Sequence, residues 1–290
     1  MLERQQALAA LHQEILACRR CALAGYHVEG APVLGGTPDM LTDAHHVMLI
    51  GQAPGRVEAG NGRPFSGPAG KRLFGWLAGV GIAEDAFRRQ VYMAAMTRCY
   101  PGPSPTGHGD RRPTSRELAL CRRFLDRQID LVVPQLVLLV GGLAIEAFLG
   151  KLKLDEAVGR FHERNAWRYL ALPHPSGAST WLNDPSHQAL LRRSLDLLRA
   201  SGLILPSAGS ALDLHQSQKG SGRATDSGLR LSDCGLGLDH EAPTINVERL
   251  AGDERSGAGG QEDDGVGNLA GRAQPAHGDG GDQPGLQVVG

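Results

Sequence analysis

The residues of this chain with the clearest potential for chemistry are four cysteines in its first half. Cys18 and Cys21 form a C-x2-C pair, whereas Cys99 and Cys121 come singly from later parts of the chain. Four thiolates can ligate Zn2+ or an iron–sulfur cluster, because both accept four sulfur ligands. Structural zinc sites usually draw on two compact pairs, so the spacing favours a cluster; zinc and four ordinary buried thiols stay open as alternatives. A fifth cysteine, Cys234, is interpreted as a free thiol.

A second group combines a histidine and a phenylalanine with runs rich in Gly and Pro. The run Gly51-Gln52-Ala53-Pro54-Gly55 follows an apolar stretch, and His174 follows another. Phe65 lies in the Pro- and Gly-rich run 62–70. A strand-end loop of this composition can hold backbone N–H groups fixed against a ligand or a water. Each fragment alone is weak, since a lone histidine at a strand end is more often structural and a phenylalanine is usually core.

In this order and company, the motifs resemble the family 4 iron–sulfur uracil-DNA glycosylases over residues 14–200. Residues 51–55 are similar to the first glycosylase motif, which reads Gly-Glu-Ala-Pro-Gly in family 4, and His174-Pro175-Ser176 matches the second. The resemblance implies that the four cysteines hold a 4Fe-4S cluster, with Zn2+ as the alternative. It implies a monofunctional DNA-repair glycosylase, which extrudes a base and hydrolyses its N-glycosidic bond.

The resemblance also assigns roles to individual residues. It implies that Phe65 stacks on the extruded base, and that His174 hydrogen-bonds uracil O2 and stabilises the anionic leaving group. Water would be positioned by Gln52 and the backbone of the 51–55 loop. The implied set is catalytic His174 and Gln52, with substrate-binding Gly51, Ala53, Phe65, Ala95 and Ser176.

Three positions depart from the family patterns. Gln52 replaces the family 4 Glu, and Ala53 stands where family 1 has its water-activating Asp, so this loop offers no carboxylate as general base. Ala95 replaces the Asn that reads the Watson–Crick edge of uracil. The substrate is therefore uracil or another deaminated base such as hypoxanthine, with Glu58 and Asn61 as candidates to compensate. The alternative is a catalytically inactive iron–sulfur nucleic-acid-binding protein of the same fold.

The loop between the last two of the four cysteines is longer than this family leads us to expect. It carries Arg111 and Arg112, which could contact DNA phosphates or lie in a solvated loop.

The apolar pattern predicts an alternation of helices and strands. Thr114, with Glu117 three positions on, predicts the N-cap of a helix that carries Cys121. Strands followed by helices indicate a three-layer αβα sandwich around a mostly parallel, four-stranded sheet, with ligands at the carboxyl ends of the strands. Strands are expected at 47–50, 91–96, 136–140 and 169–172. Helices are expected at 2–17, 73–80, 115–132 and 185–200, and from after Gly142 through Leu149.

Composition divides the chain at residue 205. Residues 1–205 hold 24 Lys and Arg against 18 Asp and Glu, a net charge of +6 that favours DNA as a partner. Residues 206–290 hold 6 against 13, contain no aromatic residue and have glycine at 18 of 85 positions. We therefore expect a glycosylase-like domain over 1–205 and a disordered, acidic tail over 206–290. The tail either competes with DNA for the domain or is a solvated extension without a role.

No stretch approaches the ~18 apolar residues of a membrane span, and the N-terminus resembles an amphipathic helix instead of a signal peptide. We expect a cytoplasmic, monomeric protein that binds double- or single-stranded DNA and no membrane. In that reducing compartment, spaced cysteines favour metal ligation over disulfides.

Overall fold

Helices and strands alternate along the chain in the computed structural model, which describes residues 1–42, 47–105, 109–164, 167–177 and 180–205. The strands are β1 (Val47–Gly51), β2 (Val91–Ala95), β3 (Leu136–Val140), β4 (Phe161–Arg164) and β5 (Trp167–Leu172). The helices are α1 (Leu2–Leu16), α2 (Arg20–Leu23), α3 (Arg56–Asn61), α4 (Pro68–Ala78), α5 (Glu84–Gln90), α6 (Ser115–Val132), α7 (Gly142–Leu149), α8 (Leu154–Ala157) and α9 (Pro185–Ala200). The tail over 206–290, for which we expected disorder, lies outside the described residues.

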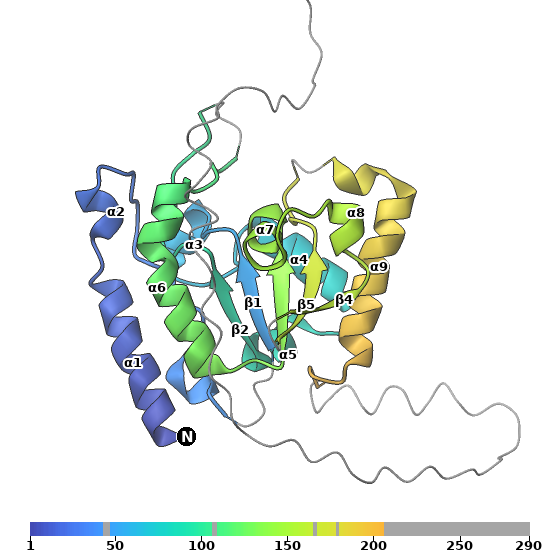
Figure 1. Cartoon of the computed structure of the whole chain (residues 1–290), viewed down its shortest axis with the longest axis horizontal. Helices are drawn as coiled ribbons and strands as arrows, with labels where there is room; N and C mark the ends of the chain where they lie inside the picture. Colours follow the sequence, from blue (N-terminus) through green and yellow to red (C-terminus); the bar gives the residue numbers. More distant parts are fainter. Residues whose placement is uncertain (43–46, 106–108, 165–166, 178–179, 206–290) are drawn as a thin grey trace, which may run out of the picture. The chain divides into compact units, whose positions relative to one another are not determined.

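The strands form one sheet with the order β2-β1-β3-β5-β4 (Figure 1). Strands β2, β1, β3 and β5 run parallel, and β4 pairs antiparallel with β5. The mixed α/β class and the mostly parallel sheet are thus confirmed, but the sheet has five strands where the sequence predicted four. Strand β4 was missed because it is a short edge strand of half-exposed and exposed residues, without the apolar run of a central strand.

Alternate residues of the strands face two separate layers of helices. Met48 and Ile50 of β1 pack in one core with α1, α6 and α7. Val47 and Leu49 pack in a second core with α4, α5 and α9. The central strands are buried on both faces, as expected of parallel strands covered by helices, and the three-layer sandwich is confirmed.

Helix α6 begins where its sequence predicts. The side chain of Thr114 accepts a hydrogen bond from the backbone N–H of Glu117 at 3.2 Å, and the carboxylate of Glu117 accepts one from the N–H of Thr114 at 2.8 Å. This reciprocal capping box contributes about 1 kcal/mol to the stability of a helix N-terminus. It fixes the start of the helix that carries Cys121. Among the described residues, no helix combines the length and apolarity needed to cross a membrane.

Candidate functional site

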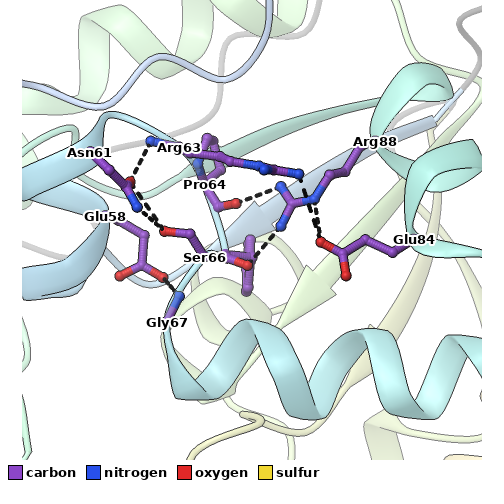
Figure 2. Close-up of polar contacts among 9 residues, drawn as sticks. Glu58, Asn61, Arg63, Pro64, Ser66, Gly67, Glu84 and Arg88 are labelled. Atoms are coloured by element: carbon purple, nitrogen blue, oxygen red, sulfur yellow. Dashed lines mark hydrogen bonds and ion pairs between the residues drawn. The ribbon is translucent and has the colours of Figure 1, made fainter.

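The loop that carries Phe65 is fixed from one side by helix α3. The carboxylate of Glu58 accepts a hydrogen bond from the N–H of Gly67 at 2.9 Å, and Asn61 exchanges hydrogen bonds with the hydroxyl of Ser66 at 3.0 and 3.1 Å (Figure 2). We considered Glu58 and Asn61 as substitutes for the base-reading Asn that Ala95 replaces. Both side chains instead form hydrogen bonds within the protein. Their hydrogen bonds shape the loop.

Helix α5 fixes the same loop from the other side. The guanidinium of Arg88 donates to the carbonyl oxygens of Pro64 and Phe65, both at 2.8 Å, and pairs with Glu84 at 2.7 Å (Figure 2). The side chain of Arg88 is only 12% exposed, so water competes little with the hydrogen bonds between its charged guanidinium and the loop carbonyls.

Phe65 has a strained, left-handed backbone conformation, which the hydrogen bonds to its loop stabilise. Its φ of 51° lies in the left-handed region, which costs a non-glycine residue of order 1–3 kcal/mol. The half-buried ring lies against Gly51 at the end of β1, where a Cβ would stand 3.1 Å from Cζ of the ring. Strain concentrated at one aromatic residue above a strand end is typical of a ligand-contacting position.

His174 lies beyond the carboxyl end of β5, two residues after its last residue Leu172. Gly141, which follows β3, has a φ of 90°, and a Cβ there would stand 3.0 Å from Cδ2 of the imidazole. Glycine at this position therefore leaves room for the ring. The backbone N–H of Ser176 donates a hydrogen bond to Nδ1 of His174 at 3.2 Å.

The surroundings of His174 favour a neutral imidazole with its proton on Nε2. Burial lowers the pKa of His174, the positive charge of Arg112 lowers it further, and the charge of Asp110 opposes both. Because Nδ1 accepts from the N–H of Ser176, the ring proton is on Nε2. The site thus presents a hydrogen-bond donor that carries no positive charge.

Both rings stand above neighbouring strand ends. Gly51 ends β1 and Gly141 follows β3, and these two parallel strands are hydrogen-bonded neighbours, which lie about 4.8 Å apart. Phe65 contacts the first of these glycines and His174 the second. The structure therefore brings together two residues that lie more than a hundred positions apart in the sequence.

The other residues expected in the site lie at the same edge of the sheet. Ala95 ends β2 directly opposite Gly51 in the register. Gln52 and Ala53 follow β1 and are half-buried. Ser176 is anchored through its carbonyl oxygen, which accepts a hydrogen bond from Arg72 of α4 at 2.8 Å.

A separate cavity of about 490 Å³ is lined by all four cysteines of the first half of the chain. Cys18 reaches it from the segment between α1 and α2, Cys21 from α2, Cys99 from the loop after β2, and Cys121 from α6. Among the described residues, no three His, Cys, Asp or Glu side chains lie close enough to hold a metal ion as they stand. The thiols share a cavity without forming a closed ligand sphere.

The surroundings of three of these thiols, Cys21, Cys99 and Cys121, raise their pKa values. Burial raises the pKa of Cys99 to about 12 and that of Cys21 to about 11, and the charges of neighbouring cysteines add to both shifts. Burial also raises the pKa of Cys121. A bound cation supplies the positive charge that such thiols need to ionise.

One buried cation at the cavity, Arg98, uses only part of its hydrogen-bonding capacity within the described residues. Arg98, which is 2% exposed, lines the cavity, and its backbone N–H donates to Sγ of Cys121 at 3.3 Å. Its Nη1 donates to Gln128 at 2.6 Å, but within the described residues Nε and Nη2 have no hydrogen-bond partner. Unpaired buried donors are costly and call for an acceptor. An anionic, sulfur-ligated cluster supplies both acceptor atoms and charge, so the residues present fit such a group.

The long loop between Cys99 and Cys121 brings a carboxylate that sequence reasoning did not identify. Asp110 lies beside Gly55, where a Cβ would stand 3.0 Å from its Oδ2. Arg111, considered above as a phosphate contact, is instead paired with Glu117 at 2.7 and 2.8 Å. Arg112 is exposed, as a phosphate contact would be. The only sequence signal for Asp110 was the unexpected length of this loop.

The fold and the site define a class: three-layer α/β proteins whose functional loops meet at the carboxyl ends of a parallel sheet. The family model of the uracil DNA glycosylase superfamily matches residues 38–198. The chain belongs to this superfamily.

Curated relatives agree with this assignment. The chain is 27% identical to the type-4 uracil-DNA glycosylase of Archaeoglobus fulgidus over 180 residues, which cover 59% of this chain and 82% of the relative. It is 25% identical to that of Sulfurisphaera tokodaii over 206 residues, 67% of this chain and 84% of the relative. It is 29% identical to that of Thermotoga maritima over 155 residues, 53% of this chain and 72% of the relative. These relatives support a DNA glycosylase role for the family of this chain.

Proposed function

We propose that this protein is a monofunctional DNA glycosylase that extrudes uracil or another deaminated base from DNA and hydrolyses its N-glycosidic bond. The observation that carries the proposal is the placement of two rings: His174 lies against Gly141, which follows β3, and Phe65 lies against Gly51 at the end of the neighbouring strand β1. An extruded base loses its stacking partners, and an aromatic ring replaces them.

Bond cleavage in such a reaction is dissociative. Negative charge grows on the departing base while the sugar becomes oxocarbenium-like, so a donor at the base oxygen stabilises the transition state more than the ground state. His174 supplies that donor, and the N–H of Ser176 keeps the imidazole oriented. In this proposal, Gln52 and the backbone of Gly51 and Ala53, which lie at or directly after the end of β1, position the attacking water.

The identity of the base is less restricted than in an enzyme that reads the Watson–Crick edge. Ala95, next to Gly51 in the sheet, has no side-chain donor or acceptor. A site without a partner for the base edge loses discrimination among bases of similar shape. We therefore propose uracil, hypoxanthine and xanthine as candidate substrates.

We further propose that Cys18, Cys21, Cys99 and Cys121 hold a 4Fe-4S cluster, with Zn2+ as the alternative. The shared cavity and the unpaired nitrogens of Arg98 support an anionic group of that size. When bound, the group contributes folding free energy by joining distant segments of the chain. Iron analysis and absorption near ~400 nm separate the two, because iron–sulfur centres absorb there and Zn2+ does not.

The glycosylase proposal is tested with duplex and single-stranded oligonucleotides that contain uracil, hypoxanthine or xanthine. Abasic sites are detected by alkaline strand cleavage. We expect product with at least one base, and a loss of about 10²–10³-fold in the excision rate of His174→Ala, the usual cost of one such donor. His162→Ala, which removes an imidazole from the edge strand β4, serves as the control and should keep the rate.

The absence of a base-reading side chain at Ala95 also favours a second candidate, an iron–sulfur nucleic-acid-binding protein without catalysis. Salt-sensitive DNA binding with no abasic product from any of these bases would support that candidate and refute the enzyme.

A further inference from the structure

The long loop between Cys99 and Cys121 returns a carboxylate to the first glycosylase loop. Gly55 ends that loop and forms the N-cap of α3. Oδ2 of Asp110 stands 3.0 Å from the position of a Cβ on Gly55, so the carboxylate packs directly against this backbone. The 51–55 loop itself contains no acidic residue, since it reads Gly51-Gln52-Ala53-Pro54-Gly55.

The position of Asp110 is fixed from both sides of the residue. On one side, the N–H of Ser104 donates to the carbonyl of Gly109 at 2.9 Å. On the other, the N–H of Arg111 donates to the carbonyl of Gly102 at 3.1 Å. The guanidinium of Arg111 also forms two hydrogen bonds to Glu117, at the capped start of α6. Hydrogen bonds of the residues on both sides of Asp110 therefore fix this part of the loop.

The side chain of Asp110 is accessible and lies near a buried phenol. Burial and then the neighbouring Asp110 raise the pKa of Tyr100, which is 2% exposed. Asp110 itself is exposed, so water reaches the carboxylate, which accepts more than one hydrogen bond. It also lies near the leaving-group donor, since its charge acts on His174.

A second carboxylate at Gly55 is already committed to the protein. Glu58 is 8% exposed and binds the N–H of Gly67 through Oε1. Its other oxygen, Oε2, faces the same Gly55 at the start of α3, where a negative charge stabilises the helix N-terminus. Of the two carboxylates, only Asp110 is open to the water that the reaction consumes.

We propose that Asp110 is the catalytic carboxylate of this glycosylase and replaces the acidic residue missing from the 51–55 loop. The N-glycosidic bond breaks, and its electron pair leaves with the base, whose oxygen accepts the hydrogen bond from His174. A water oxygen bonds to C1′ of the sugar, and Asp110 accepts the proton that the water loses. That proton is passed to the base anion or to solvent, so the products are a free base and an abasic site.

This inference rests on the proposed glycosylase function, and its test separates the two. The rate of base excision is measured under single-turnover conditions for the full-length protein and for Asp110→Asn, Asp110→Glu and Asp110→Ala. We expect Asp110→Asn to lower the rate by about 100-fold or more, as is typical of lost general-base catalysis, with DNA binding and the melting temperature unchanged. Asp155→Asn, which changes an exposed carboxylate of helix α8 outside the candidate site, should keep the full rate.

Two readouts distinguish chemistry from a structural role. Added formate should restore part of the rate of Asp110→Ala, and Asp110→Glu should keep more activity than Asp110→Asn, because both return a carboxylate. An unchanged rate in Asp110→Asn would overturn the inference while leaving the glycosylase proposal intact. If Glu58→Gln folds and loses the excision rate while the Asp110 variants keep it, Glu58 is the catalytic carboxylate and the inference about Asp110 is also overturned. If the unaltered protein produces no abasic site from any base, the glycosylase function itself fails, and Asp110 with it.

Discussion

At the scale of single residues, the chemistry of the site depends on the protonation state of His174. Burial and then the charge of Arg112 lower its pKa, so the neutral form persists below the ordinary value of about 6.5. Protonation places a hydrogen on Nδ1, which then faces the N–H of Ser176 and loses the bond that orients the ring. A group with a lowered pKa is favoured neutral in the folded protein, and that stabilisation is present above pH 6.5 and lost as the pH falls towards the folded pKa.

We therefore predict that the single-turnover excision rate is level through pH 6.5 and declines only at lower pH. Arg112→Ala removes one cause of the lowered pKa, so the decline should begin at a higher pH than in the unaltered protein. Arg116→Ala, an exposed substitution on the first turn of α6, is the matched control for loss of positive charge. A decline centred above pH 6.5 in the unaltered protein would contradict the prediction.

A second prediction at this scale concerns Arg98 and the proposed cluster. Removing the buried cation in Arg98→Met leaves an anionic group without its counter-charge, which is strongly destabilising in a buried site. We expect less iron per chain in the purified variant and faster bleaching of its absorption in air. Arg98→Lys keeps the charge and should retain more iron, and Arg123→Met, an exposed position of α6, should retain all of it. Full iron content and normal stability to air in Arg98→Met would refute this role.

Sequence reasoning found residues whose chemistry is visible in short motifs. It assigned roles to His174 and Phe65 through the short motifs that contain them, and it expected ligands at the carboxyl ends of the strands, where His174 follows an apolar stretch. It missed Asp110, since nothing near that residue in the sequence indicates that its loop folds back onto Gly55. It also left Arg111 as a candidate DNA contact, because an ion pair with Glu117 depends on the path of the loop.

At the scale of elements, helix α4 positions Phe65 through a glycine. A Cβ on Gly70 would overlap the carbonyl group of Phe65, so the helix can approach the strained loop only without a side chain here. We predict that Gly70→Ala lowers the free energy of unfolding by about 1–3 kcal/mol, the typical cost of inserting an extra group into a packed region. It should also lower the excision rate, because the added methyl group displaces Phe65.

The same helix offers a matched control for Gly70→Ala. Gly75 has no atom within 4 Å of the position of a Cβ. Gly75→Ala should therefore stabilise the helix by about 0.5–1 kcal/mol through backbone entropy alone and leave excision unchanged. Urea unfolding of both variants, alongside their excision rates, checks the pair. Equal stability changes in the two would show that Gly70 does not set the position of the loop.

Long amphipathic or apolar elements were predictable, and short polar ones were not. Helix α6 and strand β3 match their predicted ranges, because the capping residues and apolar runs mark their ends locally. Helix α4 begins at Pro68, five residues before the predicted start, since the Gly- and Pro-rich run 67–70 resembled a loop although Pro at a first helical position is favourable. Strand β4 forms by antiparallel pairing with the next strand, β5, and its own half-exposed and exposed residues contain no apolar run that predicts a strand.

At the scale of the whole molecule, the described domain ends where its last residues are tied to the body. Gln90, at the end of α5, bonds both the N–H of Leu205 at 2.8 Å and its carbonyl at 2.7 Å. Ile204 is 9% exposed and belongs to the core that α4, α5 and α9 share. These contacts support our proposal that the folded domain comprises residues 1–205.

Charge then gives residues 206–290 a testable effect on DNA binding. Residues 1–205 carry a net charge of +6 and the covalently attached residues 206–290 one of −7, so the attached segment is expected to compete with DNA phosphates for the basic domain. We predict that a chain ending at Leu205 keeps its melting temperature and excision rate but binds DNA more tightly at low salt. The difference should shrink as salt rises, because screening weakens the competition and DNA binding together. A chain in which the acidic residues of 206–290 are changed to Asn and Gln keeps the length and should behave like the truncated one. Equal affinities at low salt would show that the segment does not compete with DNA, and a lower melting temperature on truncation would place the domain boundary beyond residue 205.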